Sequence, residues 1–171
     1  SNAKTHIFDC VYAEGKYVAA GADQYLATSS NGITWTQRNW VKWTQDLWGI
    51  AYGNGTFVAG GDDGYTYTSD DGVTWTKRIH PSIGRLQDIA YGDGKFVGVG
   101  TNATFYVSTD NGVTWTANGS AGQNLICVTY GHGRFVAGGR LGTIYTSTNG
   151  TSWSKVNSGV NIHIWNLKPI G

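Results

Sequence analysis

Two tryptophans, two adjacent aspartates and three arginines are the side chains of this chain best suited to binding a ligand. Indole rings stack on the apolar faces of sugars, and carboxylate and guanidinium groups hydrogen-bond pairs of hydroxyls. The predicted ligand-binding residues are Trp40, Trp43, Asp62, Asp63, Arg78, Arg85 and Arg140. Trp40 and Trp43 have an alternative, structural interpretation, in which they cover a sheet edge or fill a subunit contact.

Other reactive side chains are scattered. His6, His80, His132 and His163 show no paired spacing and no C-x-x-C occurs, so no metal site is predicted. There is no nucleophile elbow and no phosphate-binding glycine motif. Loop carboxylates such as Asp23 with Asp46 or Asp63 are conceivable partners in glycoside hydrolysis, but solvated aspartates are the simpler interpretation. We predict no catalytic residues and no cofactor.

The composition argues against nucleic acids and membranes as partners. With 12 basic and 11 acidic residues the chain has no electrostatic footprint for a nucleic acid. No apolar run approaches the roughly 18 residues of a membrane span. The opening Ser1-Asn2-Ala3 resembles the remains of a cleaved tag, so residues 4–171 are expected to form one domain. A bacterial protein placed in the periplasm, at the cell surface or outside the cell is expected.

A repeat positions these residues. A motif with hydroxyl or acidic side chains, a glycine and a tryptophan recurs four times, and its tryptophans are 40, 40 and 38 residues apart. A fixed period near 40 residues is typical of an array of supersecondary units. The repeats cover about 7–46, 47–85, 86–124 and 125–163, and residues 164–171 begin a fifth copy that stops after one strand.

Each repeat predicts four short antiparallel strands, here called A to D from the centre outward. Residues 47–52 exemplify the near-continuous apolar A strand, buried on both faces. Trp48 and, in the partial fifth repeat, Trp165 lie in such strands and are predicted to be core residues. Asn54-Gly55 and its counterparts follow, and such pairs accept the positive φ values of a two-residue hairpin. Repeated four-stranded units form a β-propeller, so the predicted fold class is all-β with essentially no helix. The D–A and B–C loops then share one face, which would bear the ligand-binding residues.

The tryptophan motif resembles the Asp-box, or bacterial neuraminidase repeat, of sialidases and many secreted propellers. In that family the hydroxyl and Asp side chains bond turn amides, the glycine takes a left-handed conformation, and the tryptophan packs between sheets. The resemblance implies a structural role for Thr28, Ser30, Gly32 and Trp35; Thr68, Asp70, Gly72 and Trp75; Ser108, Asp110, Gly112 and Trp115; and Thr146, Thr148, Gly150 and Trp153. Because Ser30 and Thr148 stand where the other copies have Asp, their turns are expected to be looser.

The resemblance does not extend to sialidase chemistry. That reaction needs an arginine cluster, a Tyr nucleophile with a Glu partner and an acidic acid/base. The five arginines are dispersed, and the only glutamate, Glu14, lies in an A–B turn away from the ligand face. We therefore predict a non-catalytic module that binds a glycan or a protein. A carbohydrate-active enzyme, or a fragment of one, is the first alternative, and a structural self-assembly module is the second.

The partial fifth repeat leaves ring closure open. Four blades could close on themselves, several chains could complete a larger ring, or the chain could be part of a longer propeller. We favour a homo-oligomer, because an open arc exposes whole blade faces. Cys10 and Cys127 are expected to be buried free thiols; a disulfide would require Cα atoms within about 7 Å.

Overall fold

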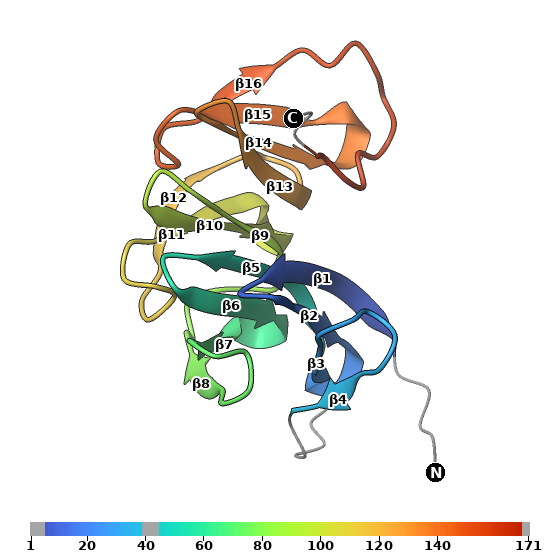
Figure 1. The fold of residues 1–171 in the computed structure, drawn as a ribbon. Helices are drawn as coiled ribbons and strands as arrows, with labels where there is room; N and C mark the ends of the chain where they lie inside the picture. The colour runs from blue at the N-terminus through green and yellow to red at the C-terminus, as the bar shows by residue number, and fades with distance from the viewer. Residues whose placement is uncertain (1–5, 39–44, 169–171) are drawn as a thin grey trace.

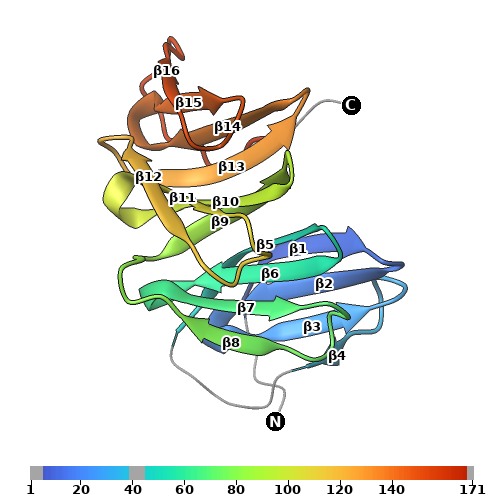
Figure 2. The same ribbon diagram turned by 90° about the vertical axis from the view of Figure 1, so that its left-hand side faces the viewer.

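Four antiparallel sheets of four strands each are arranged as the blades of a β-propeller in the computed structural model, which describes residues 6–38 and 45–168. Within each sheet the strands are hydrogen-bonded in chain order. Successive blades pack through their inner strands, and blades 1 and 4 lie at the two ends of the arrangement (Figures 1 and 2). The predicted all-β propeller is confirmed.

The strands fall into the four predicted classes. The inner A strands are β1 (Ile7–Ala13), β5 (Leu47–Gly53), β9 (Leu86–Gly92) and β13 (Leu125–Gly131). The B strands are β2 (Lys16–Gly21), β6 (Thr56–Gly61), β10 (Lys95–Gly100) and β14 (Arg134–Gly139). The C strands are β3 (Leu26–Ser29), β7 (Tyr65–Ser69), β11 (Thr104–Ser108) and β15 (Ile144–Ser147). The outer D strands are β4 (Thr36–Gln37), β8 (Thr76–Ile79), β12 (Thr116–Ser120) and β16 (Ser154–Val156).

The A–B hairpins have the predicted two-residue turns. Both residues of each turn have positive φ, as in Asn54 (48°) and Gly55 (74°) or Asp93 (45°) and Gly94 (73°). Consecutive positive φ values are the signature of a type I′ turn, whose twist matches that of the flanking strands. Local sequence therefore sets the hairpin register.

The B–C loops contain the only helical elements among the described residues, four single 3-10 turns that the sequence pattern did not predict. They are η1 (Ala22–Gln24), η2 (Asp62–Gly64), η3 (Thr101–Ala103) and η4 (Arg140–Gly142). The first backbone N–H of each turn donates to a carbonyl just before the A strand of the same blade, as Asp62 does to Asp46 at 3.0 Å. These bonds hold the B–C loops beside the starts of the inner strands. None of these short turns has the length or apolar character of a membrane-spanning helix.

The core lies between the blades. Phe57, Phe96 and Phe135, one on each of three successive B strands, are completely buried. At the ends of β5 and β9 a tyrosine of the next blade packs against a glycine: a Cβ on Gly53 would lie 1.9 Å from the Tyr91 ring, and one on Gly92 2.1 Å from the Tyr130 ring. Because close packing leaves no room for a side chain there, glycine is required at these positions for the blades to approach one another.

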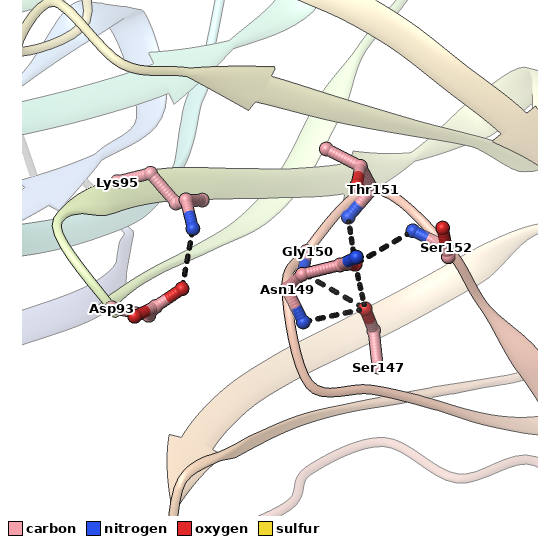
Figure 3. A network of polar contacts seen from close by, with 7 residues as sticks. All are labelled: Asp93, Lys95, Ser147, Asn149, Gly150, Thr151 and Ser152. Atoms are coloured by element: carbon pink, nitrogen blue, oxygen red, sulfur yellow. Dashed lines mark hydrogen bonds and ion pairs between the residues drawn. The ribbon is translucent and has the colours of Figure 1, made fainter.

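The tryptophan motif forms a tight turn between strands C and D, but its bonding residues lie one position from those predicted in three repeats. In blade 2 the Gly72 N–H donates to Ser69 Oγ (2.8 Å), and the Val73 and Thr74 N–H groups donate to Asp71 Oδ1 (2.7 Å). The same roles belong to Ser29 with Asn31 in blade 1 and to Ser147 with Asn149 in blade 4 (Figure 3). Only the blade 3 turn, one residue longer, uses the predicted Ser108 and Asp110.

The residues predicted for those roles are placed differently. Thr28 and Thr68 accept hydrogen bonds from the Nε groups of Arg38 and Arg78, whereas Asp70 accepts one from Thr56. Ser30 and Thr148 are exposed, so the expected weakening of their turns does not occur: Asn31 and Asn149 supply the acceptor instead. In all four turns the Asp or Asn acceptor lies two residues after the bonding serine, so the serine identifies the acceptor.

The tryptophans close these turns. The indole N–H of Trp35, Trp75 and Trp153 donates to the carbonyl of the motif glycine at 3.0 to 3.2 Å. Trp115 follows the longer turn, and its buried N–H finds no acceptor among the described residues.

The partial fifth repeat packs on blade 4 without forming a paired strand. Ile164 donates its N–H to Gly139 (2.9 Å), and Ile164 and Leu167 lie over Gly138. Leu86 and Ile89 of blade 3 lie over Gly60 of blade 2 in the same manner. The segment 162–168 thus occupies the place of the next inner strand, and we call it the C-terminal segment.

Candidate ligand-binding site

A cavity of about 680 Å³ lies between the four inner strands and the C-terminal segment. Residues from β1, β5, β9 and β13 form its walls, and Thr101 and Arg140 of the B–C turns reach its edge. The cavity therefore adjoins the loop face on which the sequence places a ligand.

A β-bulge in each A strand shapes the wall. The pairing register shifts at one residue in each, and the residues passed over are Phe8, Trp48, Gln87 and Ile126. A bulge re-aims a side chain that regular alternation would point between the sheets. All four residues line the cavity. The sequence predicted Trp48 as a core residue, and the bulge explains why it is not.

Trp48 belongs to a polar and aromatic cluster at this wall. Its indole N–H donates to Asp62 Oδ1 (3.1 Å), and the Nε of Arg85 donates to the same oxygen (2.5 Å). Arg85 also lies over the Trp48 ring, 4.8 Å from its centroid, and Phe8 stacks on that ring at 4.2 Å. Asp62 therefore orients two side chains at once, and the cluster is held rigid before any ligand binds.

Two aspartates of the cavity wall join neighbouring blades. Asp9 accepts the N–H groups of Cys10 and, in the next blade, Ile50, both at 2.8 Å. Asp88 does the same with Ile89 and Val128. Burial raises the pKa of both carboxyls, that of Asp88 to about 7, and the charge of Asp9 adds to the increase at Asp88. Each of these carboxyl groups therefore links the inner strands of two neighbouring blades by hydrogen bonds.

The predicted ligand-binding residues separate into three groups. Asp62 and Arg85 form an ion pair, and Arg85 and Arg140 line the cavity. Asp63 is exposed at the tip of its turn, and Arg78 lies apart, in a groove with Asp70 and Asp110. Trp40 and Trp43 lie outside the described residues.

The C-terminal segment supplies further lining residues that sequence reasoning did not select. Trp165 was expected in the core, but 71% of its surface is exposed and it makes an edge contact with the His163 ring. Both residues and Lys168 line the cavity. Trp165 is therefore the tryptophan of this cavity that has an accessible ring.

No metal centre emerges from the parts of the chain that are described. No group of three or more potential metal ligands occurs within those ranges. Asp46 lies close to Asp23, but its Oδ1 accepts the backbone N–H of Asp23 at 3.1 Å, which gives it a structural role.

The cysteines are both free thiols, and only one is buried. Cys127 is buried, with its Sγ 3.6 Å from the carbonyl oxygen of Ile164, and burial raises its pKa to about 12. Cys10 is exposed on β1, contrary to the expected burial, because no preceding blade covers that strand.

The comparisons with known proteins establish the fold. No protein-family model and no curated protein sequence matches the chain. Among solved structures, the computationally designed Ika8 protein matches 96% of this chain with a TM-score of 0.74 and 13% identity. YCF48 bound to D1 peptide matches 95% (TM-score 0.74, 20% identity), and YCF48 from Cyanidioschyzon merolae matches 91% (0.69, 15%). A GH74 enzyme of Niastella koreensis matches 89% with a TM-score of 0.70 and 26% identity.

The chain spans 53% to 58% of the length of the designed protein and the YCF48 chains, and 24% of the GH74 enzyme. Together with four blades around a cavity, these similarities define the chain as a β-propeller repeat protein. Its neighbours include an enzyme and a peptide-bound protein, so the fold alone does not name a ligand.

Proposed function

We propose that the protein is a non-catalytic binding module that takes a glycan at the mouth of the central cavity, on the D–A/B–C face. The observation that carries the proposal is the combination in the cavity lining of an accessible indole, Trp165, with the charged side chains of Arg85 and Arg140, of which Arg85 is paired with Asp62. An aromatic ring matches the apolar face of a sugar, and the charged groups match its hydroxyls. The likeness to a GH74 enzyme, at 26% identity, agrees with this ligand class.

The wall carboxylates support binding rather than hydrolysis. Glycosidases need one carboxyl to move a proton and another to attack or to activate water. Both oxygens of Asp9 and of Asp88 instead accept backbone N–H groups that join two blades. Using either group as an acid or a nucleophile would break a contact that holds the cavity together.

Membership of the Asp-box family is part of the proposal. Its support is the recurring turn in which a serine and an Asp or Asn bond the amides ahead of a tryptophan, as with Ser69, Asp71 and Trp75. The turns lie at C–D connections and serve the blades. An extracellular or periplasmic location accompanies this proposal.

A peptide is the second candidate ligand. A similar propeller, YCF48, has a structure with a bound D1 peptide, and the cavity edge offers cations at Arg140 and Lys168 for an acidic chain. A peptide would depend on these cations and on salt, whereas a neutral glycan would depend on the Trp165 ring.

Binding of oligosaccharides by matched variants tests the proposal. Cellotetraose, chitotetraose and sialyllactose are titrated into the protein by calorimetry, alongside a panel of acidic peptides. We expect at least one sugar to bind and Trp165→Ala or Arg140→Ala to weaken it about tenfold or more, the effect of roughly 1.4 kcal/mol. Arg134→Ala, an exposed arginine of the A–B hairpin end, is the control. Binding of peptides alone would replace the glycan by the second candidate.

A further inference from the structure

Blade 1 exposes a face that every other blade buries. We call this the leading face and define it by Tyr12, Tyr17, Ile33 and Trp35. Tyr12 is 61% exposed and Ile33 84%, whereas Val73 and Val113, the counterparts of Ile33 in blades 2 and 3, are 40% exposed. Tyr17 is exposed where Phe57, Phe96 and Phe135 are completely buried. The difference arises because a preceding blade covers each leading face except the first.

The interior interfaces show what such a face fits. The motif turn of one blade lies against the B strand of the blade before it: a Cβ on Gly72 would be 3.2 Å from Val18 Cγ2, and one on Gly112 2.9 Å from Val58 Cγ1. The Lys16 ammonium group donates to the carbonyl of Asp71 in that turn (3.0 Å). Figure 3 shows Lys95 of blade 3 beside the Asn149–Gly150 turn of blade 4.

Blade 4 exposes the complementary surface, the trailing face, defined by Gly131, Arg134 and Val136. Val136 is partly exposed, although its counterparts Val18, Val58 and Val97 are completely buried. Arg134 is exposed and occupies the B-strand position of Lys16, so its guanidinium could reach a turn carbonyl as Lys16 does. The trailing face therefore carries the apolar and the hydrogen-bonding partner of a leading face.

The C-terminal segment covers only the inner edge of the trailing face. Ile164 and Leu167 contact Gly138 there, as Leu86 and Ile89 contact Gly60 in the interior. The segment brings no B, C or D strand, and Trp165 and Ile162 project from it largely exposed. It is thus a partial copy of the inner strand that a complete blade would bring.

We propose that the C-terminal segment is a replaceable cap, and that blade 1 of a second copy takes its place and docks its leading face on the trailing face of blade 4. The interface continues one that already occurs three times inside the chain. In it Tyr12 lies over Gly131, the Gly32 turn lies over Val136, and Arg134 donates to the carbonyl of Asn31. This interface is heterologous because it joins two different faces. Successive copies therefore either close a ring or extend as a filament.

The test weakens the cap in the full-length chain. The Ile164→Ser/Leu167→Ser variant removes the two partly buried aliphatic side chains that contact Gly138, and Ile162→Ser is the matched control because Ile162 is exposed in the same segment. Sedimentation velocity measures self-association over a concentration series. We expect the double variant to associate at least about tenfold more tightly than the wild type, since the two partly buried aliphatic side chains together contribute more than about 1.4 kcal/mol to holding the cap in place. The control should match the wild type.

Blocking single faces tests the head-to-tail geometry. Each face is blocked in the Ile164→Ser/Leu167→Ser variant, by Ile33→Asp on the leading face or by Val136→Asp on the trailing face. Neither blocked protein should self-associate, and mixing the two should restore a 1:1 dimer. Arg134→Glu serves as a second trailing-face variant should Val136→Asp unfold, as judged by circular dichroism. An Ile164→Ser/Leu167→Ser variant that remains monomeric overturns the proposal. So does association that persists when both faces are blocked, because that would be nonspecific contact of apolar surface.

Discussion

Asp88 predicts how the stability of the propeller depends on pH. Its carboxyl joins the inner strands of blades 3 and 4, and burial raises its pKa from 3.8 to about 7. The folded state therefore prefers the protonated form, and between these pKa values it binds more protons than the unfolded chain. The stabilisation is complete below pH 3.8 and is lost as the pH rises through about 7.

The magnitude follows from the size of the shift. One pKa unit corresponds to about 1.4 kcal/mol, so the full shift is worth roughly 4 kcal/mol, of which about 3 kcal/mol is lost between pH 5 and pH 8. Asp9 has the same sign and adds to the decrease, while the lowered pKa of Asp71, about 2, acts only in stronger acid.

Urea unfolding at pH 5 and pH 8 measures the effect. In Asp88→Asn an amide replaces one acceptor oxygen, which costs roughly 1 to 3 kcal/mol at pH 5. The variant has no proton to lose, so its free energy of unfolding should change far less with pH and should equal or exceed that of the wild type at pH 8. Asp63→Asn, at an exposed turn tip, is the control. An Asp88→Asn variant with the same pH dependence as the wild type would refute the reasoning.

Three further predictions follow from the turns, the blade contacts and the thiols. Ser147→Ala removes the acceptor of the Gly150 N–H and should lower the free energy of unfolding by about 1 kcal/mol. Thr148→Ala, at an exposed site, should change it by less than about 0.5 kcal/mol. Equal effects of the two substitutions in urea unfolding would contradict the role of Ser147. Gly53→Ala places a Cβ 1.9 Å from the Tyr91 ring and should lower the free energy of unfolding by roughly 3 kcal/mol or more. The Cβ of Gly55→Ala meets open space, so this variant should lose only about 1 kcal/mol through the strain of its positive φ. Similar melting temperatures for the two variants would contradict the packing between blades. Maleimide should label exposed Cys10 in the folded protein and leave buried Cys127 unlabelled until urea is added, as read by peptide mass spectrometry; a single crosslinked peptide in oxidised protein would show a disulfide instead.

The sequence predicted the blades because their signals are local. An apolar run followed by Asn-Gly or Asp-Gly specifies a hairpin without reference to the remaining chain, and the period near 40 residues repeats it. The bonding residues of three motif turns were assigned one position away, because the motif was aligned on its glycine and tryptophan. Counting from the serine identifies the acceptors, since Asn31, Asp71, Asp110 and Asn149 each lie two residues after it.

The site was less predictable because it depends on departures from regular pairing. Strict alternation places Trp48 in the core, but a bulge turns it to the cavity wall. The role of Asp88 depends on an amide 40 residues away, that of Val128, which only the packing of two blades brings near. Trp165 lies in an unpaired segment, where alternation carries no information. Arg85 and Asp62 were both predicted as ligand-binding residues, but the ion pair between them was not predicted.

The indole N–H resonances of the eight tryptophans offer the most direct test of the binding face, because they report on both sides of the molecule. Each is assigned by single Trp→Phe substitution and followed in ¹H–¹⁵N spectra while cellotetraose, chitotetraose and sialyllactose are added in turn. The account predicts that a binding sugar shifts the resonances of Trp165 and Trp48 at the cavity and leaves those of Trp35, Trp75, Trp115 and Trp153 in the motif turns unchanged. Shifts confined to the motif tryptophans, or no shift with any of the sugars, would contradict it.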